Sequence, residues 1–262
     1  MSNSTAAILS WYKDIGVNAI LSDVPTNNFE EPVEKLNTKK QPTKATEAKE
    51  KPKVTKQNDE KVQPSIDSAK KANTLEELKE AIRAFDGSNL KDTATNLVFA
   101  DGDPKSPIML IGEAPGSEED TQGLPFVGNS GKLLTTIFKT IGYDREQLYI
   151  TNVIPWRPPG NRTPTPQEIA MFRPFLEKHI QLVDPKIIIL VGSTAVKALL
   201  DDKDVIMTKY RGQFVNFHNS IAQKDYKAFA IYHPSFLLRS PGQKRKMWQD
   251  MLVLKEYLSN NL

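Results

Sequence analysis

The sequence predicts a three-layer α/β fold with a central, mostly parallel sheet of four strands. Short apolar runs, typical of buried strands, alternate along the chain with stretches in which apolar residues recur at helical spacing. Loops rich in glycine and proline follow several of these runs. Strands that alternate with helices favour parallel pairing, because each helix returns the chain to the same end of the sheet.

The individual elements follow from the same patterns. Core strands are expected at 108–111, 148–154, 186–191 and 228–232, with a peripheral strand at 214–217. Helices are expected to begin near residues 74, 130, 165 and 193, and another is expected to cover 247–258. The start at Thr165 is the clearest, because Pro166 suits the first helical position and Glu168 can complete a capping box.

Three segments of the chain differ in composition. Residues 1–24 carry apolar side chains at helical spacing and predict a short amphipathic helix. Residues 25–72 are rich in Lys, Glu, Thr, Gln and Pro and contain few large apolar residues. Such a segment cannot bury enough surface to offset its ordering entropy, so we expect a disordered linker there. Residues 73–262 are expected to form the folded domain.

The composition excludes several kinds of site. The chain has no cysteine, so it cannot form disulfides, thiolate metal sites or a cysteine-ligated iron–sulfur cluster. A disulfide-free chain fits a reducing compartment, and we expect a cytoplasmic protein, associated with the nucleoid if the source is bacterial. No apolar run approaches the roughly 20 residues of a membrane span, so no membrane partner is expected. The formal net charge of +3 is compatible with a polyanionic partner.

Three loops carry the candidate functional side chains, and each follows the carboxyl end of a predicted core strand. Phe126 lies in the first loop, Asn152 begins the second and His233 begins the third. Such loops converge on an open parallel sheet. An aromatic ring can stack on a base, an amide can donate and accept along a base edge, and a histidine can stabilise a leaving anion. Together they predict a pocket that acts on a base extruded from nucleic acid.

Each of these residues also has a purely structural explanation. Phe126 could be a core residue, Asn152 a turn residue and His233 a structural hydrogen-bonding group. Glu113 could bind the backbone amides of its own tight loop. Only their joint occurrence on three successive loops favours a functional site.

Five motifs carry a resemblance to a known family. They are GEAPG at 112–116, PFVG at 125–128, YITN at 149–152, RPPGNR at 157–162 and HPSFLLR at 233–239. In this order and spacing they resemble the uracil-DNA glycosylase superfamily, most closely its family 4. The resemblance covers roughly residues 74–258. It implies a four-stranded parallel sheet between helices and an enzyme that excises uracil from DNA.

One departure from family 4 is large. Its members typically bind a [4Fe–4S] cluster through four cysteines, whose positions fall here on or next to Phe85, Ser88, Trp156 and Phe172. None of these residues can ligate iron as cysteine does. Three of them are large and apolar, so we expect packed side chains to fill the space of the cluster.

The resemblance also assigns roles to individual residues. Phe126 is expected to stack on the extruded uracil, Asn152 to read its amide edge, and His233 to stabilise the leaving anion at uracil O2. The substrate-binding loop is expected to include Gly112 and Glu119. Leu237 is expected to be a wedge in the space left by the base, and Ser235 and Arg239 are expected to hold phosphates. The full set of residues expected to contact DNA is Arg157, Asn161, Arg162, Ser235, Leu237 and Arg239.

The usual water-activating group is absent from these motifs. The best-known superfamily branch has Gln-Asp-Pro where this chain has Glu113, Ala114 and Pro115, so the water-activating aspartate is missing. Glu113 is expected to orient water or to offset positive charge on the sugar, with Glu119 as the alternative. The expected reaction is hydrolysis of the N-glycosidic bond of deoxyuridine in DNA, with no metal or cofactor.

Two other functions stay open. One is a non-catalytic DNA-binding or polymerase-associated module on the same fold, and the other is a glycosylase for another deaminated base. The expected partner is uracil-containing DNA, single- or double-stranded, bound by a monomer. The N-terminal helix could dock on its own domain, or the helix and linker could recruit a repair or replication partner.

Overall fold

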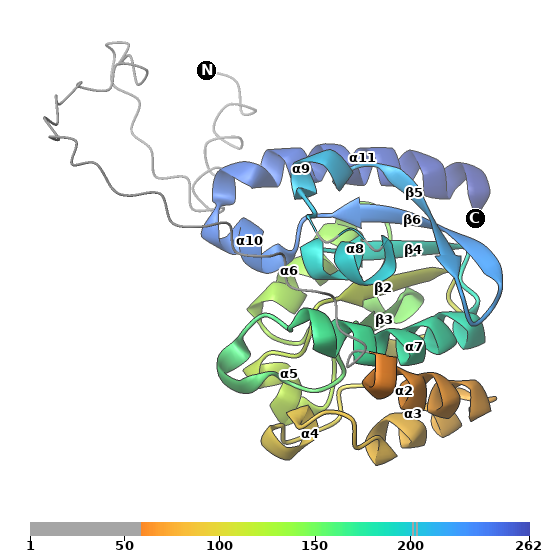
Figure 1. Cartoon of the computed structure of the whole chain (residues 1–262). Coiled ribbons are helices and arrows are strands. Elements are labelled where there is room, and N and C mark those ends of the chain that lie inside the picture. Colours follow the sequence, from red (N-terminus) through yellow and green to blue (C-terminus); the bar gives the residue numbers. More distant parts are fainter. Residues whose placement is uncertain (1–58, 201, 203) are drawn as a thin grey trace, which may run out of the picture. The chain divides into compact units, whose positions relative to one another are not determined.

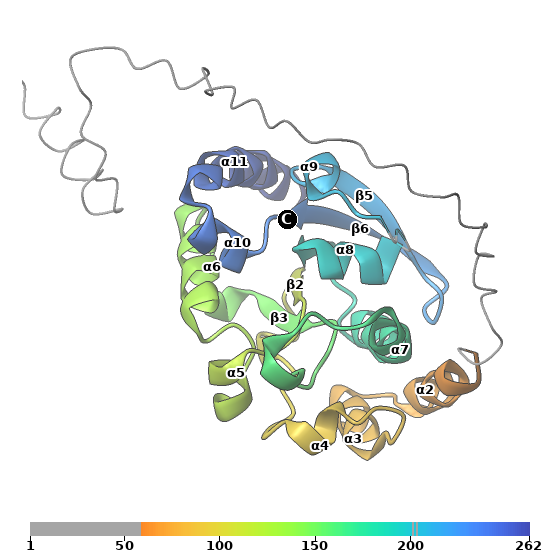
Figure 2. The same ribbon diagram turned by 60° about the vertical axis from the view of Figure 1, so that its left-hand side comes forward.

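The computed structural model describes residues 59–200, 202 and 204–262. The helix expected within 1–24 and most of the linker expected at 25–72 lie outside the described residues. The described part contains one six-stranded sheet with helices on both faces (Figures 1 and 2). The strands are β1 (Asp101–Gly102), β2 (Ile108–Gly112), β3 (Tyr149–Asn152), β4 (Ile187–Val191), β5 (Phe214–Asn219) and β6 (Lys224–Ile231).

The helices divide between longer elements and short turns. The longer helices are α2 (Asp59–Lys71), α3 (Leu75–Ala84), α6 (Asn129–Thr140), α7 (Pro166–Val183), α8 (Ser193–Leu200) and α11 (Lys244–Asn261). The short ones are α4 (Leu90–Thr93), α5 (Ser117–Gln122), α9 (Met207–Tyr210), α10 (Pro234–Arg239) and the 3₁₀ turns η1 (Arg145–Gln147), η2 (Pro159–Asn161) and η3 (Pro241–Gln243). Among the described residues, no helix combines the length and the apolar character needed to cross a bilayer.

The sheet order is β1-β3-β2-β4-β6-β5. The four central strands, β3, β2, β4 and β6, pair in parallel, as the sequence predicts. Both edge strands are antiparallel to their neighbours. The peripheral strand expected at 214–217 is β5, whereas β1 was not predicted, because its two residues leave no periodic pattern.

Side chains of the central strands fill two cores, one on each face of the sheet. In β4, Ile188 and Leu190 face the core under α2, α3, α7 and α8, whereas Ile187, Ile189 and Val191 face the core under α6, α10 and α11. Every residue of β2, β3 and β4 is buried. Burial on both faces explains why β2 and β4 are continuous apolar runs rather than alternating ones.

The helix start predicted at Thr165 is confirmed. The backbone N–H of Glu168 donates to Thr165 Oγ1 at 3.2 Å, and the backbone N–H of Thr165 donates to Glu168 Oε2 at 2.8 Å. This capping box satisfies donors that the first turn of α7 would otherwise leave unpaired.

The prediction of disorder up to residue 72 is wrong for its last part. Residues 59–71 form α2, which packs against α7. Its inward face consists of Val62, Ser65, Ile66 and Ala69, at the spacing of an amphipathic helix, and Ser65 and Ala69 are fully buried. Because two of the four residues are small, a search for large apolar residues does not find this face.

Candidate functional site

A cavity of about 860 Å³ opens at the carboxyl ends of the four parallel strands. The loops that follow β2, β3, β4 and β6 all contribute to its wall. The structure brings nine of the predicted site residues to this cavity: Glu113, Glu119, Phe126, Asn152, Asn161, Arg162, His233, Ser235 and Arg239. Gly112, Arg157 and Leu237 do not line it.

Gly112 supports the cavity from behind. It is the last residue of β2 and pairs with Asn152, the last residue of β3. A Cβ atom at Gly112 would collide with Oδ1 of Asn152 and with the ring of Phe126. Glycine at this position therefore allows an aromatic ring and an amide to approach the same strand end.

Phe126 has a strained backbone. Its φ angle is 52°, a left-handed conformation that residues other than glycine rarely adopt and that costs on the order of 1–3 kcal/mol. The side chain is buried, and its ring centroid lies 5.8 Å from that of His233. Strain of this kind persists only where neighbouring contacts impose it, and it is concentrated at functional sites.

Asn152 presents a free amide to the cavity. The residue is only 6 % exposed. Its side chain makes no hydrogen bond to any described residue. Since a buried amide needs partners, its donor and its acceptor are both available to a ligand in the cavity.

His233 is held as a neutral ring. The backbone N–H of Ser235 donates to Nδ1 of His233 at 3.1 Å, and the Ser235 hydroxyl lies 2.8 Å from the same nitrogen. Burial, aided by the positive charge of Arg239 and opposed by Glu119, lowers the pKa of His233 to about 4. Because Nδ1 accepts the backbone N–H, the neutral ring carries its proton on Nε2 and can donate it.

Glu113 is oriented by a residue that the sequence analysis did not identify. The hydroxyl of Thr194, in the first turn of α8, donates to Oε2 of Glu113 at 2.5 Å. Thr194 is 2 % exposed, whereas Glu113 is half-buried and lines the cavity, so the contact holds a cavity-facing carboxylate from its buried side. Thr194 follows β4 closely, and the loop after β4 lies at the same edge of the sheet as the other three. Its place after a predicted core strand could therefore have indicated Thr194.

Glu119 braces its own loop. Its Oε1 accepts the backbone N–H groups of Val127 and Gly128 at 3.1 and 2.9 Å, and its Oε2 accepts that of Gly116 at 3.1 Å. These three contacts tie the start of α5 to the segment that follows Phe126. Of the two carboxylates considered for water activation, Glu119 is therefore occupied by backbone donors.

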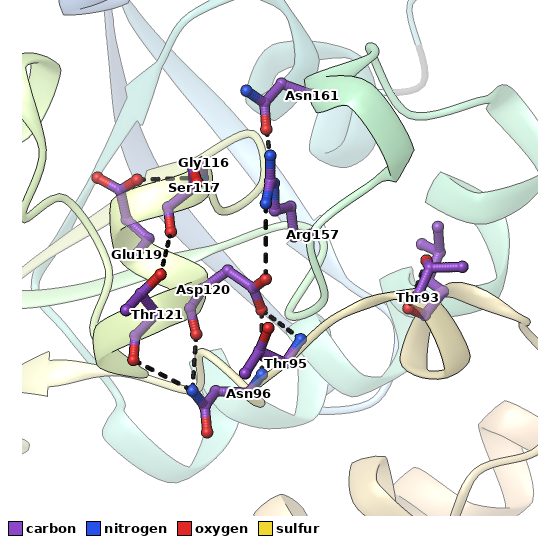
Figure 3. A network of polar contacts seen from close by, with 11 residues as sticks. Thr93, Thr95, Asn96, Gly116, Ser117, Glu119, Asp120, Thr121, Arg157 and Asn161 are labelled. Atoms are coloured by element: carbon purple, nitrogen blue, oxygen red, sulfur yellow. Dashed lines mark hydrogen bonds and ion pairs between the residues drawn. The ribbon is translucent and has the colours of Figure 1, made fainter.

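A polar network fixes the second loop (Figure 3). Arg157 donates from Nε to Oδ1 of Asn161 at 2.7 Å, and its Nη1 lies 3.8 Å from Oδ2 of the buried Asp120. Oδ1 of Asp120 accepts the backbone N–H groups of Thr95 and Asn96. Arg157, predicted to contact DNA, thus joins α5 to η2 rather than facing the cavity.

Arg162 is also paired within the chain. Its guanidinium donates to both carboxylate oxygens of Glu168, at 2.8 and 2.6 Å, and this pairing lowers the pKa of Glu168. The side chain of Arg162 is still 43 % exposed and lines the cavity. Its exposed part can therefore contact a phosphate while Nη1 and Nη2 stay paired with Glu168.

Comparison with known proteins agrees with this arrangement. The family model described as the uracil DNA glycosylase superfamily matches residues 99–252. The chain belongs to this superfamily. A type-4 uracil-DNA glycosylase from Sulfurisphaera tokodaii is 37% identical over 70% of this chain and 84% of the relative. Another from Thermotoga maritima is 36% identical over 70% of this chain and 94% of the relative. A DNA polymerase of Bacillus phage SP01 is 29% identical over 64% of this chain but only 18% of the polymerase.

The residues at the cluster positions expected from family 4 do not fit an iron–sulfur cluster. Phe85, Ser88, Trp156 and Phe172 are all buried, none more than 8 % exposed. The ring of Phe85 packs edge-on against the rings of Phe172 and Phe175, with centroid distances of 6.0 and 5.2 Å. In the described part of the chain, no group of three or more His, Cys, Asp or Glu could hold a metal ion. Aromatic packing thus occupies this region, as predicted.

The prediction that Leu237 is the superfamily's DNA wedge is wrong for this structure. Leu237 is completely buried in the core under α6, α10 and α11. It lies within α10, whose helical turn directs this side chain inward and the next one outward. Leu238 is 45 % exposed and is the apolar residue that this motif presents to solvent.

Proposed function

We propose that this protein is a uracil-DNA glycosylase, which hydrolyses the N-glycosidic bond of deoxyuridine in DNA and leaves free uracil and an abasic site. The single observation that carries the proposal is the convergence of Phe126, the unpartnered amide of Asn152 and the neutral ring of His233 on one cavity. A scaffold that contacts only the DNA backbone has no use for this combination.

The first step is recognition of an extruded base. Extrusion costs a few kcal/mol and is easiest in single strands and mispairs. Phe126 stacks on the base, while Asn152 donates to uracil O4 and accepts from uracil N3–H. Cytosine presents the complementary pattern on this edge, so an Asn152 amide held in this orientation would face donor with donor and acceptor with acceptor.

The second step is departure of the base. The bond between C1′ and N1 breaks, its electron pair goes to the uracil, and the sugar becomes oxocarbenium-like. His233 donates its Nε2 proton in a hydrogen bond to uracil O2, where negative charge develops. One preorganised donor of this kind typically contributes about 3–4 kcal/mol.

The third step is capture of the sugar by water. We assign Glu113, held by Thr194, the task of orienting the water and accepting its proton as the oxygen bonds to C1′. Its negative charge also offsets the positive charge on the sugar. The uracil anion takes a proton from solvent after release, so no co-reactant is required.

A second candidate function has some support. Ala114 stands where the best-known branch has its catalytic aspartate, and part of a phage DNA polymerase is similar to this chain. Both observations favour a non-catalytic module that binds DNA beside a polymerase. Such a module would bind uracil-containing DNA without cleaving it.

The test is cleavage of defined DNA. Purified full-length protein is incubated with a uracil-containing single strand and with U:G and U:A duplexes, and abasic sites are then cut with alkali. We expect cleavage at the uracil, no cleavage of matched cytosine DNA, and severe loss in Asn152→Asp, which replaces an amide donor with a charged acceptor. Binding without cleavage of all three substrates would instead support the polymerase-associated module.

A further inference from the structure

The strained segment that carries Phe126 is bound by a residue outside the cavity. Arg145, in η1, donates from Nη1 to the carbonyl oxygen of Phe126 at 2.9 Å and from Nη2 to that of Pro125 at 2.6 Å. One guanidinium thus binds two successive carbonyls of the segment that carries the ring. Its planar fork fixes the orientation of both peptide groups, which a single donor could not do.

The guanidinium is itself anchored to the sheet. Nε of Arg145 donates to Oδ2 of Asp101 at 2.7 Å, and Asp101 lies in β1, which pairs with β3 through Ile150. The side chain of Arg145 is only 19 % exposed, so water competes weakly for these contacts. The position of the 125–126 segment is therefore tied to the strand that ends in Asn152.

The carbonyl of Phe126 is also approached closely by α6. A Cβ atom at Gly131, in the first turns of α6, would collide with the backbone carbonyl of Phe126. Both α6 and the guanidinium of Arg145 thus contact the backbone of Phe126. The left-handed φ directs the ring toward Gly112 and His233.

We propose that Arg145 is a positioning residue for base stacking. It fixes the Pro125 and Phe126 carbonyls, and through them it sets the place of the Phe126 ring against the extruded base. The identity of the stacked base rests on the proposed function. The contacts of Arg145 with the two carbonyls do not depend on it. Arg145 does not line the cavity and acts only through Phe126.

A purely structural role makes a different forecast. If Arg145 only ties the edge strand β1 to the sheet, its loss lowers thermal stability while the folded enzyme keeps its cleavage rate. If it positions Phe126, the rate of base excision falls at saturating enzyme, and groups beside the ring sense the change.

The experiment compares Arg145→Met, Arg145→Lys and wild type, with Arg83→Met as the matched control. Arg83 is an exposed arginine on α3 that pairs with Glu80, away from the cavity. We expect Arg145→Met to lower single-turnover excision by about 100-fold, the effect of a misplacement of about 1 Å, with affinity for abasic DNA unchanged. Arg145→Lys keeps the charge beside Asp101 but cannot bind both carbonyls in the same fork, and we expect an intermediate loss with a near-normal melting temperature.

A proton NMR spectrum reads the ring position without catalysis. The chain has three histidines, so their ring resonances are few, and only His233 lies against Phe126. We expect the His233 resonance to shift in both Arg145 variants while those of His179 and His218 stay in place. His233→Gln assigns the resonance.

Two results would overturn the inference. One is a folded Arg145→Lys protein with a wild-type rate and an unshifted His233 resonance. The other is a fall in melting temperature for both variants with unchanged excision. If the wild type does not cleave uracil DNA, the proposed function fails, and the His233 resonance alone decides whether Arg145 positions Phe126.

Discussion

The backbone N–H of Ser235 donates a hydrogen bond of 3.1 Å to Nδ1 of His233. This contact leaves Nε2 as the nitrogen that carries the proton of the neutral ring, and Nε2 is the donor assigned to the leaving uracil. The low pKa of His233, about 4, keeps the ring neutral through the physiological range. The histidine can therefore donate a hydrogen bond without bringing a full positive charge into the site.

This neutral histidine predicts a specific dependence of stability on pH. The pKa of His233 is about 4 in the folded protein against 6.5 for the free side chain, so between these values the unfolded chain binds a proton that the folded protein does not. The stabilising effect of keeping the ring neutral is complete above pH 6.5 and is lost as the pH falls toward 4. Relative to His233→Gln, the free energy of unfolding of wild type should fall by up to about 1.4 kcal/mol per pH unit.

The measurement is urea unfolding of both proteins at several pH values between 7 and 4.5. Comparison with the variant is necessary because other groups titrate in this range. Burial lowers the pKa of His179 to about 3 and raises that of Asp250 to about 6, despite its pairing with Arg211, and their effects on stability have opposite signs. A difference between the two proteins that does not change with pH would show that His233 is not held neutral.

The contact between Thr194 and Glu113 predicts a coupled pair of variants. Thr194→Val removes the hydroxyl but keeps the shape, so the Glu113 carboxylate loses its donor. A hydrogen bond to a charged group is worth about 1.5–3 kcal/mol, and we expect single-turnover excision to fall roughly 10- to 100-fold. In a Glu113→Gln background the same change should have little further effect, because the two residues act as a unit. Fully additive losses would mean that Thr194 acts independently of Glu113.

The two leucines of α10 should respond in opposite ways. Leu237→Ala removes a fully buried side chain and is expected to destabilise the protein by about 2–5 kcal/mol. Leu238→Ala changes an exposed residue and should alter stability by no more than about 0.5 kcal/mol. If Leu238 fills the space of the extruded base, its loss should reduce excision from duplex DNA more than from a single strand. Equal losses on the two substrates would exclude that role.

Aromatic packing at the expected cluster positions predicts a large cost for truncation. Phe172→Ala removes a ring that is 1 % exposed and contacts Phe85 and Phe175, and we expect a loss of about 3–5 kcal/mol in the free energy of unfolding. Trp248→Ala, at an aromatic residue of α11 that is 46 % exposed, serves as the control and should change little. A near-neutral Phe172→Ala would mean that side chains do not fill this region tightly.

The sequence predicted the parts of the fold that rest on local patterns. Strands β2 and β4 are continuous apolar runs, and the start of α7 at Thr165 depends on residues at most three positions apart, so these elements can be recognised without a structure. The small inward face of α2 was missed, although Val62, Ser65 and Ala69 have helical spacing.

Contacts across the chain could not be predicted in the same way. Arg145 binds carbonyls 19 and 20 residues away, and Thr194 binds a carboxylate 81 residues away. No spacing in the sequence records such contacts, because the sheet and its helices create them. The burial of Leu237 was missed for a related reason, since the motif alone does not show that α10 turns this side chain into the core.

The most direct test of the proposed chemistry is the single-turnover rate of His233→Ala on uracil-containing DNA, measured at saturating enzyme. We expect a loss of about 100- to 1000-fold, the typical effect of removing one donor to a developing anion. Affinity for abasic DNA should change little, because phosphate contacts dominate it. A His233→Ala protein that excises uracil at a near wild-type rate would contradict the mechanism.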